Sequence, residues 1–288
     1  MGAESLTRIA TLGHRAVITV EGEDRVSFLQ GLVSQDVALA ASGRAVWSAF
    51  LTPQGKWLAE FFIFSDGDRL LLDVEATMRE DLIRRLSRYR LRSRVSLSEG
   101  AEVVQAAWGG VAPEVGPQVL IAPDPRMEEA GFRILAALPL AANASVEEWD
   151  VHRLSLGLPE GSRDLEREKT VLLEAGFDEL GGISWSKGCY MGQELTARTR
   201  YRGLLKRRLV PVDVVEGEAP APGTPILAED GREVGSMRSS RDGHGLALLR
   251  LEALGEGILQ ADVARLRVRR PSWLRLPGQD APEDQAAG

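Results

Sequence analysis

Cys189 is the only cysteine of the chain, and it lies in the segment KGCYMGQE. Gly188 and Gly192 bracket it, so the backbone there can turn tightly or approach a ligand closely. A thiol in such a segment can react, bind a ligand or contact a partner. It can also pack as a small apolar side chain, because free cysteine is among the most buried residue types. Spacing alone favours the packing interpretation and leaves the reactive one open.

A helix is predicted directly after this cysteine, because the run QELTARTRY is rich in helix formers and ends before Gly203. Cys189 then precedes a helix N-terminus, and Lys187 lies two residues away. Both the helix dipole and a nearby cation favour the thiolate. A Cys/His pair with one of the three histidines stays open. A zinc or iron–sulfur site made by this chain alone is not expected, because such sites usually take several cysteines.

A second feature is the run RTRYRGLLKRR, residues 198–208, which carries six basic residues in eleven. One interpretation is a solvated helix face, in which Glu194 and Arg198 form an i,i+4 ion pair. The other is a surface that binds a polyanion, such as RNA, a phosphate or a chain of carboxylates. The sequence does not decide between the two.

Two acidic residues in apolar segments are further candidates. Asp36, in GLVSQDV, follows a predicted helix, where a carboxylate could hold a cationic nitrogen or act as a base. The simpler alternative is that Asp36 caps a loop. Glu174, in TVLLEAGFDEL, follows three apolar residues and is expected to be partly buried. A buried carboxylate needs hydrogen-bond partners, and the amide edge of a heterocycle is a suitable one.

The composition limits the class of protein. A chain of 288 residues with 44% hydrophobic and 27% charged residues is expected to form two or three globular domains. The net charge of −7 disfavours direct nucleic-acid binding. A single cysteine cannot form an intramolecular disulfide, so we expect a reducing compartment, the cytoplasm. The sequence shows no secretory signal and no apolar run of about 18 residues, so we expect no membrane partner.

Strands and helices are expected to mix without strict alternation, which is typical of an α+β fold. The first hundred residues predict strands at 15–21, 46–51 and 94–99, helices near 23–33 and 76–90, and a hairpin centred on Asp66 and Gly67. Residues 100–144 predict short strands and loops. Ser145 and Glu148 predict a capping box that opens a helix at 145–157. From about residue 204, short β-prone runs indicate a small all-β module.

These segments together resemble the YgfZ-type folate-binding proteins. The motif K-G-C-aromatic-x-G-Q-E is specific to that family and is present as KGCYMGQE. The other matching segments are GLVSQDV, FLTPQGKWLAEFFIF, LPEGSRDL, LEAGFDELGGISW and GLALLRLEAL. The resemblance covers nearly the whole chain except residues 100–144 and the C-terminal tail. It favours the functional interpretation of Cys189.

The family is similar in fold to the glycine-cleavage T-protein, an aminomethyltransferase that uses tetrahydrofolate. The resemblance therefore implies a T-protein-like arrangement of three domains around a central folate channel, two of them α+β and the last β-barrel-like. We expect an N-terminal domain at 1–100, a second domain carrying KGCYMGQE at 101–203, the barrel at 204–276 and a disordered tail at 277–288.

The resemblance also implies roles for residues. Asp36 matches the catalytic aspartate of the T-protein, and Glu174 matches a glutamate that contacts the pterin. Gln35 stands where the T-protein pattern often has Asn, and the chain is shorter than a typical T-protein. KGCYMGQE is not part of the T-protein pattern either, which argues against aminomethyl transfer. We expect catalytic roles for Cys189 and Asp36. The expected folate contacts are Asp36, Glu174, Lys187, Tyr190, Gln193 and Arg198.

The function implied is support of the biogenesis or repair of iron–sulfur proteins, particularly [4Fe–4S] proteins, including an enzyme of tRNA modification. The expected cofactor is tetrahydrofolate, with or without a polyglutamate tail held by residues 198–208. The expected partners are iron–sulfur client or carrier proteins, with Cys189 as nucleophile, transient cluster ligand or partner contact. A folate-dependent aminomethyl or one-carbon transferase is the main alternative, and an RNA-contacting accessory protein is the third. Whether the protein is an enzyme stays open.

Overall fold

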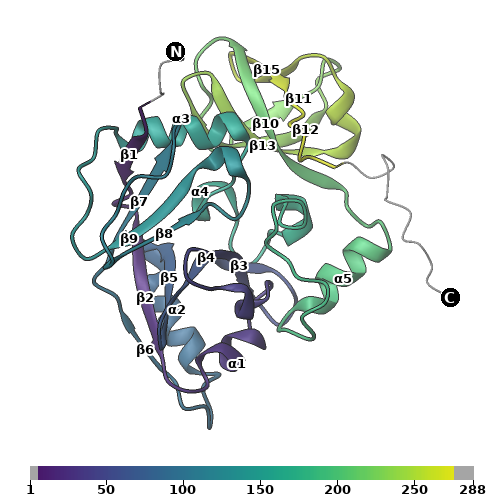
Figure 1. The fold of residues 1–288 in the computed structure, drawn as a ribbon. Coiled ribbons are helices and arrows are strands. Elements are labelled where there is room, and N and C mark those ends of the chain that lie inside the picture. The colour runs from purple at the N-terminus through teal and green to yellow at the C-terminus, as the bar shows by residue number, and fades with distance from the viewer. Residues whose placement is uncertain (1–5, 276–288) are drawn as a thin grey trace, which may run out of the picture.

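The computed structural model describes residues 6–275, which form two antiparallel sheets, a closed β-barrel and five α-helices (Figure 1). The tail expected at 277–288 lies outside the described residues. The α-helices are α1 (Arg25–Gln30), α2 (Arg79–Ser87), α3 (Val146–Leu156), α4 (Gly161–Asp164) and α5 (Gln193–Tyr201). The 3-10 helices are η1 (Val37–Leu39), η2 (Ala76–Met78), η3 (Glu128–Ala130), η4 (Leu172–Ala175) and η5 (Leu251–Gly255).

The first sheet has five strands, and its central strands are largely apolar on both faces, apart from the buried Glu60 and Asp73. In sheet order the strands are β3 (Val46–Leu51), β4 (Trp57–Asp66), β5 (Arg69–Glu75), β2 (Arg15–Glu21) and β6 (Ser96–Glu99). Successive side chains of a strand point to opposite faces. Phe62 therefore enters one core, together with α3 and the second sheet, while Phe61 enters another with α1 and α2. A strand covered on both faces reads as a continuous apolar run.

The second sheet joins distant parts of the chain. Its order is β1 (Arg8–Thr11), β7 (Val103–Trp108), β9 (Phe132–Ala136) and β8 (Val119–Pro123). The short N-terminal strand β1 thus pairs with a segment about a hundred residues away, from Arg8 opposite Trp108 to Thr11 opposite Gln105. Residues 100–144 form short strands and loops as predicted. The domain boundary near residue 100 stays a prediction.

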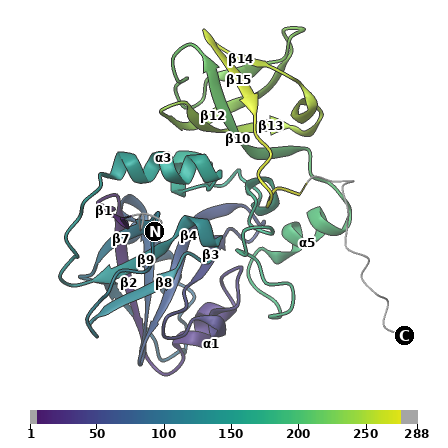
Figure 2. The same cartoon turned by 45° about the horizontal axis from the view of Figure 1, so that its top comes forward.

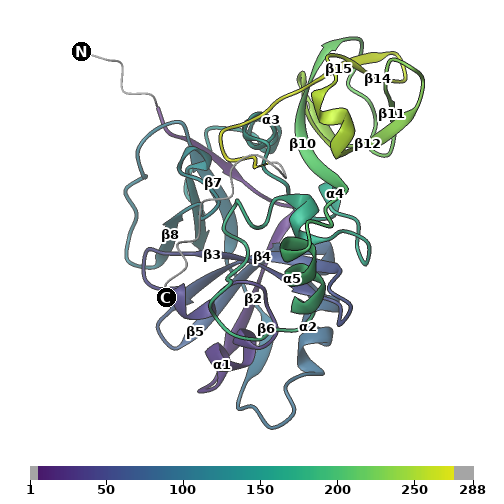
Figure 3. The ribbon, with the colours of Figure 1, turned by 90° about the vertical axis from the view of Figure 1, so that its right-hand side faces the viewer.

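The C-terminal part is a closed six-stranded barrel with its own core. Its strands in order are β10 (Arg207–Glu216), β13 (His244–Arg250), β12 (Glu233–Arg241), β11 (Pro225–Leu227), β14 (Leu259–Ala261) and β15 (Ala264–Val268). Helix α3 lies between this barrel and the two sheets (Figure 2). The view from the side shows the barrel set apart from the sheets at one end of the molecule (Figure 3).

Two short sequence patterns, a turn and a capping box, correctly predicted where elements begin and end. The hairpin between β4 and β5 turns at Gly67, whose φ is +61°. Helix α3 begins with the predicted capping box, in which Ser145 Oγ accepts from the Glu148 amide at 3.2 Å and Glu148 Oε2 accepts from the Ser145 amide at 2.8 Å. The α+β class and the C-terminal barrel are confirmed.

Candidate functional site

A cavity of about 500 Å³ opens between the start of β3, the end of β8 and the loop that carries Gly181. Its lining includes Gln35, Arg44, Trp47, Pro123, Pro125 and Gly181. Trp47 is fixed by stacking on Phe177, with ring centroids 3.9 Å apart. Gln35 is fixed by donating from Nε2 to the Gly181 carbonyl at 2.6 Å. The volume and the mixture of rings with a few polar groups are typical of a small-molecule site.

Arg44 supplies a cation at the rim of this cavity. Its side chain is exposed and has no ion pair or hydrogen bond to the residues that the structure describes. An unpaired guanidinium is suited to a carboxylate or phosphate. Sequence reasoning missed Arg44, because nothing in its neighbourhood distinguishes it from the other arginines of this chain.

Asp36 lies directly after Gln35 and has a fixed orientation. Its Oδ1 accepts from Gln30 Nε2 at 2.8 Å and from the Ala38 amide at 3.0 Å, and it caps η1. The Asp36 amide in turn donates to Gln35 Oε1 at 2.7 Å. Oδ2 has no hydrogen bond among residues 6–275 and is free to accept one, although Asp36 itself does not line the cavity. The loop-capping role and a binding role are therefore compatible.

Lys187 ties the KGCYMGQE segment to the segment that carries Asp36. Its ammonium donates to the Val33 carbonyl at 2.6 Å and to the Gln35 carbonyl at 2.9 Å. Burial lowers the pKa of Lys187 to about 8, although the negative charge of Asp36 acts to raise it. Its Nζ also lies 5.3 Å from the centre of the Tyr190 ring. The motif lysine thus connects the lining of the cavity with the loop of Cys189.

Cys189 is exposed on the loop before α5. It lies three residues before Gly192, the N-cap of that helix, so it is outside the first turn. The influence of a helix dipole falls off within that turn. The Lys187 ammonium is bound to two carbonyls, as described above. The sequence argument that these two groups activate the thiol is therefore not supported, although the thiol is accessible.

The loop around Cys189 is held firmly on both sides. Gly192 has a φ of +80° and approaches the turn of residues 52–56 so closely that an added Cβ would lie 2.5 Å from the Thr52 carbonyl oxygen. Tyr190 is buried, and burial raises the pKa of its phenol to about 12. Its amide donates to Gln193 Oε1 at 3.3 Å. Tyr190 and Gln193 thus fix the loop, and their contact with folate stays a prediction.

Glu174 and the basic run lie elsewhere in the fold. Glu174 is buried and pairs with Arg207, with Nε to Oε1 at 3.2 Å, and does not line the cavity. A pterin contact from Glu174 therefore stays a prediction. Arg198 forms the expected pair with Glu194 at 2.6 Å.

The rest of the run is largely neutralised as well. Arg200 lies 4.0 Å from Asp178, and the buried Arg208 pairs with Glu179. Four of the six basic residues thus have acidic partners, which leaves Arg202 and Lys206 without one among the described residues. Most of the positive charge of the run is thus paired with carboxylates of the protein itself. Binding of polyanions by the run stays a prediction.

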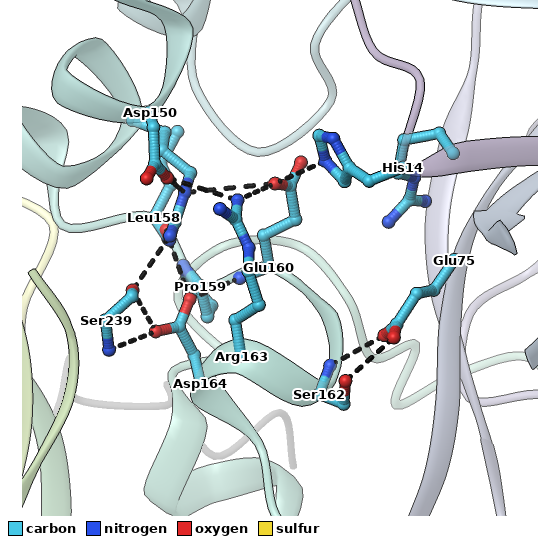
Figure 4. Close-up of polar contacts among 12 residues, drawn as sticks. His14, Glu75, Asp150, Leu158, Pro159, Glu160, Ser162, Arg163, Asp164 and Ser239 are labelled. Atoms are coloured by element: carbon cyan, nitrogen blue, oxygen red, sulfur yellow. Dashed lines mark hydrogen bonds and ion pairs between the residues drawn. The ribbon is translucent and has the colours of Figure 1, made fainter. Parts of the chain in front are cut away.

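The segment LPEGSRDL, residues 158–165, is part of a buried network of charged side chains that the sequence did not predict. Glu160 accepts from His14 Nε2 at 3.0 Å and also pairs with Arg163, as Figure 4 shows. Burial alone would raise the pKa of Glu160, but the His14 hydrogen bond and the charges of Arg153 and Arg133 hold it well below its usual range. The sequence pointed to this segment only through its match to the family pattern. That match did not predict that Glu160 would contact His14.

The structure thus brings together Gln35, Asp36 and Lys187, with Cys189 two residues further along the chain. Among the described residues there is no group of three or more histidine, cysteine or acidic side chains suited to hold a metal ion. None of the helices described is long and apolar enough to span a bilayer.

Two comparisons concern the fold. The family model described as "CAF17, C-terminal beta-barrel domain" matches residues 206–276. Among solved structures, the chain is similar to the glycine cleavage system aminomethyltransferase T from Bartonella henselae, with a TM-score of 0.76 and 15% sequence identity over 94% of this chain and 87% of that one. The expected T-protein-like fold is confirmed.

Curated relatives share the name iron–sulfur cluster assembly factor IBA57. The protein from Mycosarcoma maydis is 36% identical over 76% of this chain and 60% of its own length. The human protein is 32% identical over 83% of this chain and 76% of its own length. The protein from Pyricularia oryzae is 32% identical over 88% of this chain and 74% of its own length. The chain thus spans less than two thirds of the first relative.

These names correct two expectations. They are IBA57 names, where we expected the YgfZ-type group. Each of them includes the word mitochondrial, so the expectation of a cytoplasmic location is wrong. With more than 30% identity over more than two thirds of the human and Pyricularia oryzae proteins, the chain belongs to the family of the iron–sulfur cluster assembly factor IBA57.

Proposed function

We propose that the protein supports the assembly of iron–sulfur proteins by binding a reduced folate in the cavity and presenting Cys189 to a partner protein. One observation carries the proposal. Lys187 joins the exposed thiol loop to the carbonyls of Val33 and Gln35, and Gln35 lines the cavity. A ligand in the cavity can therefore influence the position of the thiol. The family and the names of its members support the iron–sulfur role.

The residues present fit a folate. Leu39 and the two prolines offer an apolar surface for a flat ring, and Gln35 offers an amide. Asp36 Oδ2 is free to accept hydrogen bonds from the N–H groups of a pterin, because a carboxylate is an acceptor only. Arg44 can hold a carboxylate of the glutamate end. A reduced folate, when bound, supplies a carrier of one-carbon units. The protein orients it through Asp36 and covers its ring with Leu39.

Cys189 supplies one thiol at the surface. Iron–sulfur clusters are usually held by four protein ligands, mostly cysteines. One exposed thiol can therefore hold a cluster only together with ligands from another protein, and the cluster is then cargo. The partners we propose are iron–sulfur carrier or client proteins.

Folate binding is tested by anaerobic titration of the purified protein with tetrahydrofolate, followed by tryptophan fluorescence and calorimetry. We expect saturable binding that Asp36→Ala weakens about tenfold, because a hydrogen bond to a charged group contributes about 1.5–3 kcal/mol. Arg44→Gln should weaken it about fivefold. The matched control is Arg265→Gln, which changes an exposed arginine on the barrel, away from the cavity. It should have no effect on folate binding. If the wild-type protein does not bind at millimolar folate, this part of the proposal is wrong.

A second candidate is a folate-dependent aminomethyl or one-carbon transferase. It is favoured by the free Oδ2 of Asp36, the residue that follows the cavity-lining Gln35, which could act as a base or hold a cationic nitrogen. This candidate predicts turnover of a one-carbon donor that requires Asp36 and survives Cys189→Ser. The iron–sulfur role predicts instead that function is lost in Cys189→Ser, so this variant separates the two.

A further inference from the structure

A second arginine-rich segment forms one end of the molecule. Residues 84–94, RRLSRYRLRSR, carry six arginines in eleven positions, although the net charge of the chain is −7. The segment runs from the end of α2 into the loop before β6. In two views this loop is the lowest part of the ribbon, on the end away from the barrel (Figures 1 and 3). The shape is therefore a projecting tip.

Only part of this charge is neutralised within the protein. Arg84 and Arg85 both pair with Asp81, and Arg94 lies 2.5 Å from Glu23. The remaining three arginines have no carboxylate partner among residues 6–275, and the polar contact of Arg90 is a weak one to the Val95 carbonyl at 3.4 Å. These three are Arg88, Arg90 and Arg92, and all are exposed. The tip therefore carries a positive charge that the fold does not use.

Leu91 lies in the middle of these arginines and is itself unusual. Its side chain is 90% exposed, and its φ is +42°. Bulky residues seldom adopt positive φ, because the Cβ crowds the following carbonyl. The protein thus holds an apolar side chain in water, in a backbone conformation that is itself unfavourable. Packing does not explain this leucine, and such strain points to a functional role.

We propose that this tip binds the surface of an anionic phospholipid membrane. The three unpaired arginines would bind lipid phosphates, and Leu91 would enter the boundary between head groups and acyl chains. An open hollow lined by Asp24, Leu91, Arg92 and Ser93 lies beside the tip and gives room for a head group. A single-stranded RNA fits less well. The nearest aromatic ring, Tyr89, packs edge-on against Phe50 with centroids 6.2 Å apart, so the leucine rather than a free ring forms the tip.

The test is co-sedimentation of the full-length protein with vesicles of phosphatidylcholine alone or mixed with phosphatidylglycerol. We expect binding to the mixed vesicles only, with a strong decrease at high salt. Leu91→Asn should weaken binding about tenfold, because burying a leucine contributes about that factor. Asn also tolerates positive φ, so thermal stability should be equal or higher. Replacing Arg88, Arg90 and Arg92 together by Gln should weaken binding about a hundredfold.

Leu138→Asn is the matched control, because Leu138 is 85% exposed on another loop. It should leave vesicle binding unchanged. The proposal is overturned if the wild-type protein ignores anionic vesicles, or if Leu91→Asn and Leu138→Asn behave alike. Tighter binding to single-stranded RNA than to vesicles, unaffected by Leu91→Asn, would also overturn it. So would self-association that Leu91→Asn abolishes, since the tip would then contact a second copy of the chain.

Discussion

Asp164 joins the LPEGSRDL segment to the barrel, and Asp164→Asn should loosen this connection. The side chain of Asp164 is fully buried. Its Oδ2 accepts from Arg153 Nη1 at 2.6 Å and from the Glu160 amide at 2.9 Å. Its Oδ1 accepts from the amide of Ser239, a residue of β12, at 3.1 Å, and also from the hydroxyl of Ser239. Every neighbour of this carboxylate is therefore a donor.

The magnitude follows from this geometry. An asparagine has one acceptor oxygen, and its NH₂ group must face one of the two sets of donors in either orientation. The variant thus leaves at least one buried donor unpaired and removes a negative charge from beside Arg153. Breaking a buried ion pair costs about 3–5 kcal/mol of unfolding free energy. For a chain of this size the midpoint of thermal unfolding should fall by about 10 °C.

The assay is urea and thermal unfolding followed by tryptophan fluorescence. Trp273 reports on this interface, because its Nε1 donates to the Leu156 carbonyl of α3 at 3.0 Å. Glu216→Gln is the control, since it also changes a carboxylate to an amide but in a pair with Arg265 that is 67% and 57% exposed. Such pairs contribute about 0–1 kcal/mol. Equal stability of Asp164→Asn and Glu216→Gln would refute the reasoning.

Two further predictions concern the KGCYMGQE segment. Because burial lowers the pKa of Lys187 from 10.5 to about 8, its NMR titration should show a midpoint near 8, and a midpoint near 10.5 would contradict this. The folded state binds this proton less tightly than the unfolded chain, so the contribution of Lys187 to stability rises with pH between those two values. Gly192→Ala should destabilise the fold by about 1–3 kcal/mol more than Gly188→Ala in urea unfolding. Both glycines have positive φ, but an added Cβ meets the Thr52 carbonyl only at Gly192, and equal effects would exclude this clash.

Local features of the fold could be predicted from the sequence. The alternating and continuous apolar runs of β2 to β5 determine strands, because side chains alternate between two cores. The Asp66-Gly67 turn and the Ser145 capping box depend on neighbouring residues alone. The pairing of β1 with β7 could not be predicted, because both strands are short and lie far apart in the chain.

The candidate functional residues were only partly predictable, because their contacts join segments far apart in the chain. The sequence shows the charges of residues 198–208 but not the carboxylates of Glu174, Asp178 and Glu179 that neutralise three of them. The equally basic segment at 84–94 was overlooked, because it lies outside the recognised motifs. The proximity of Lys187 to Gln35 likewise depends on the tertiary fold.

The central claim is that the exposed thiol of Cys189 serves the iron–sulfur role. In host cells, Cys189→Ser is compared with the wild-type chain and with the deletion, and the activity of a [4Fe–4S] enzyme such as aconitase is measured at matched protein levels under oxidative stress. Because Cys189 is exposed, the variant should keep the stability of the wild-type protein. We predict a loss of enzyme activity equal to that of the deletion. Full activity in Cys189→Ser, together with a defect in the deletion, would contradict the account.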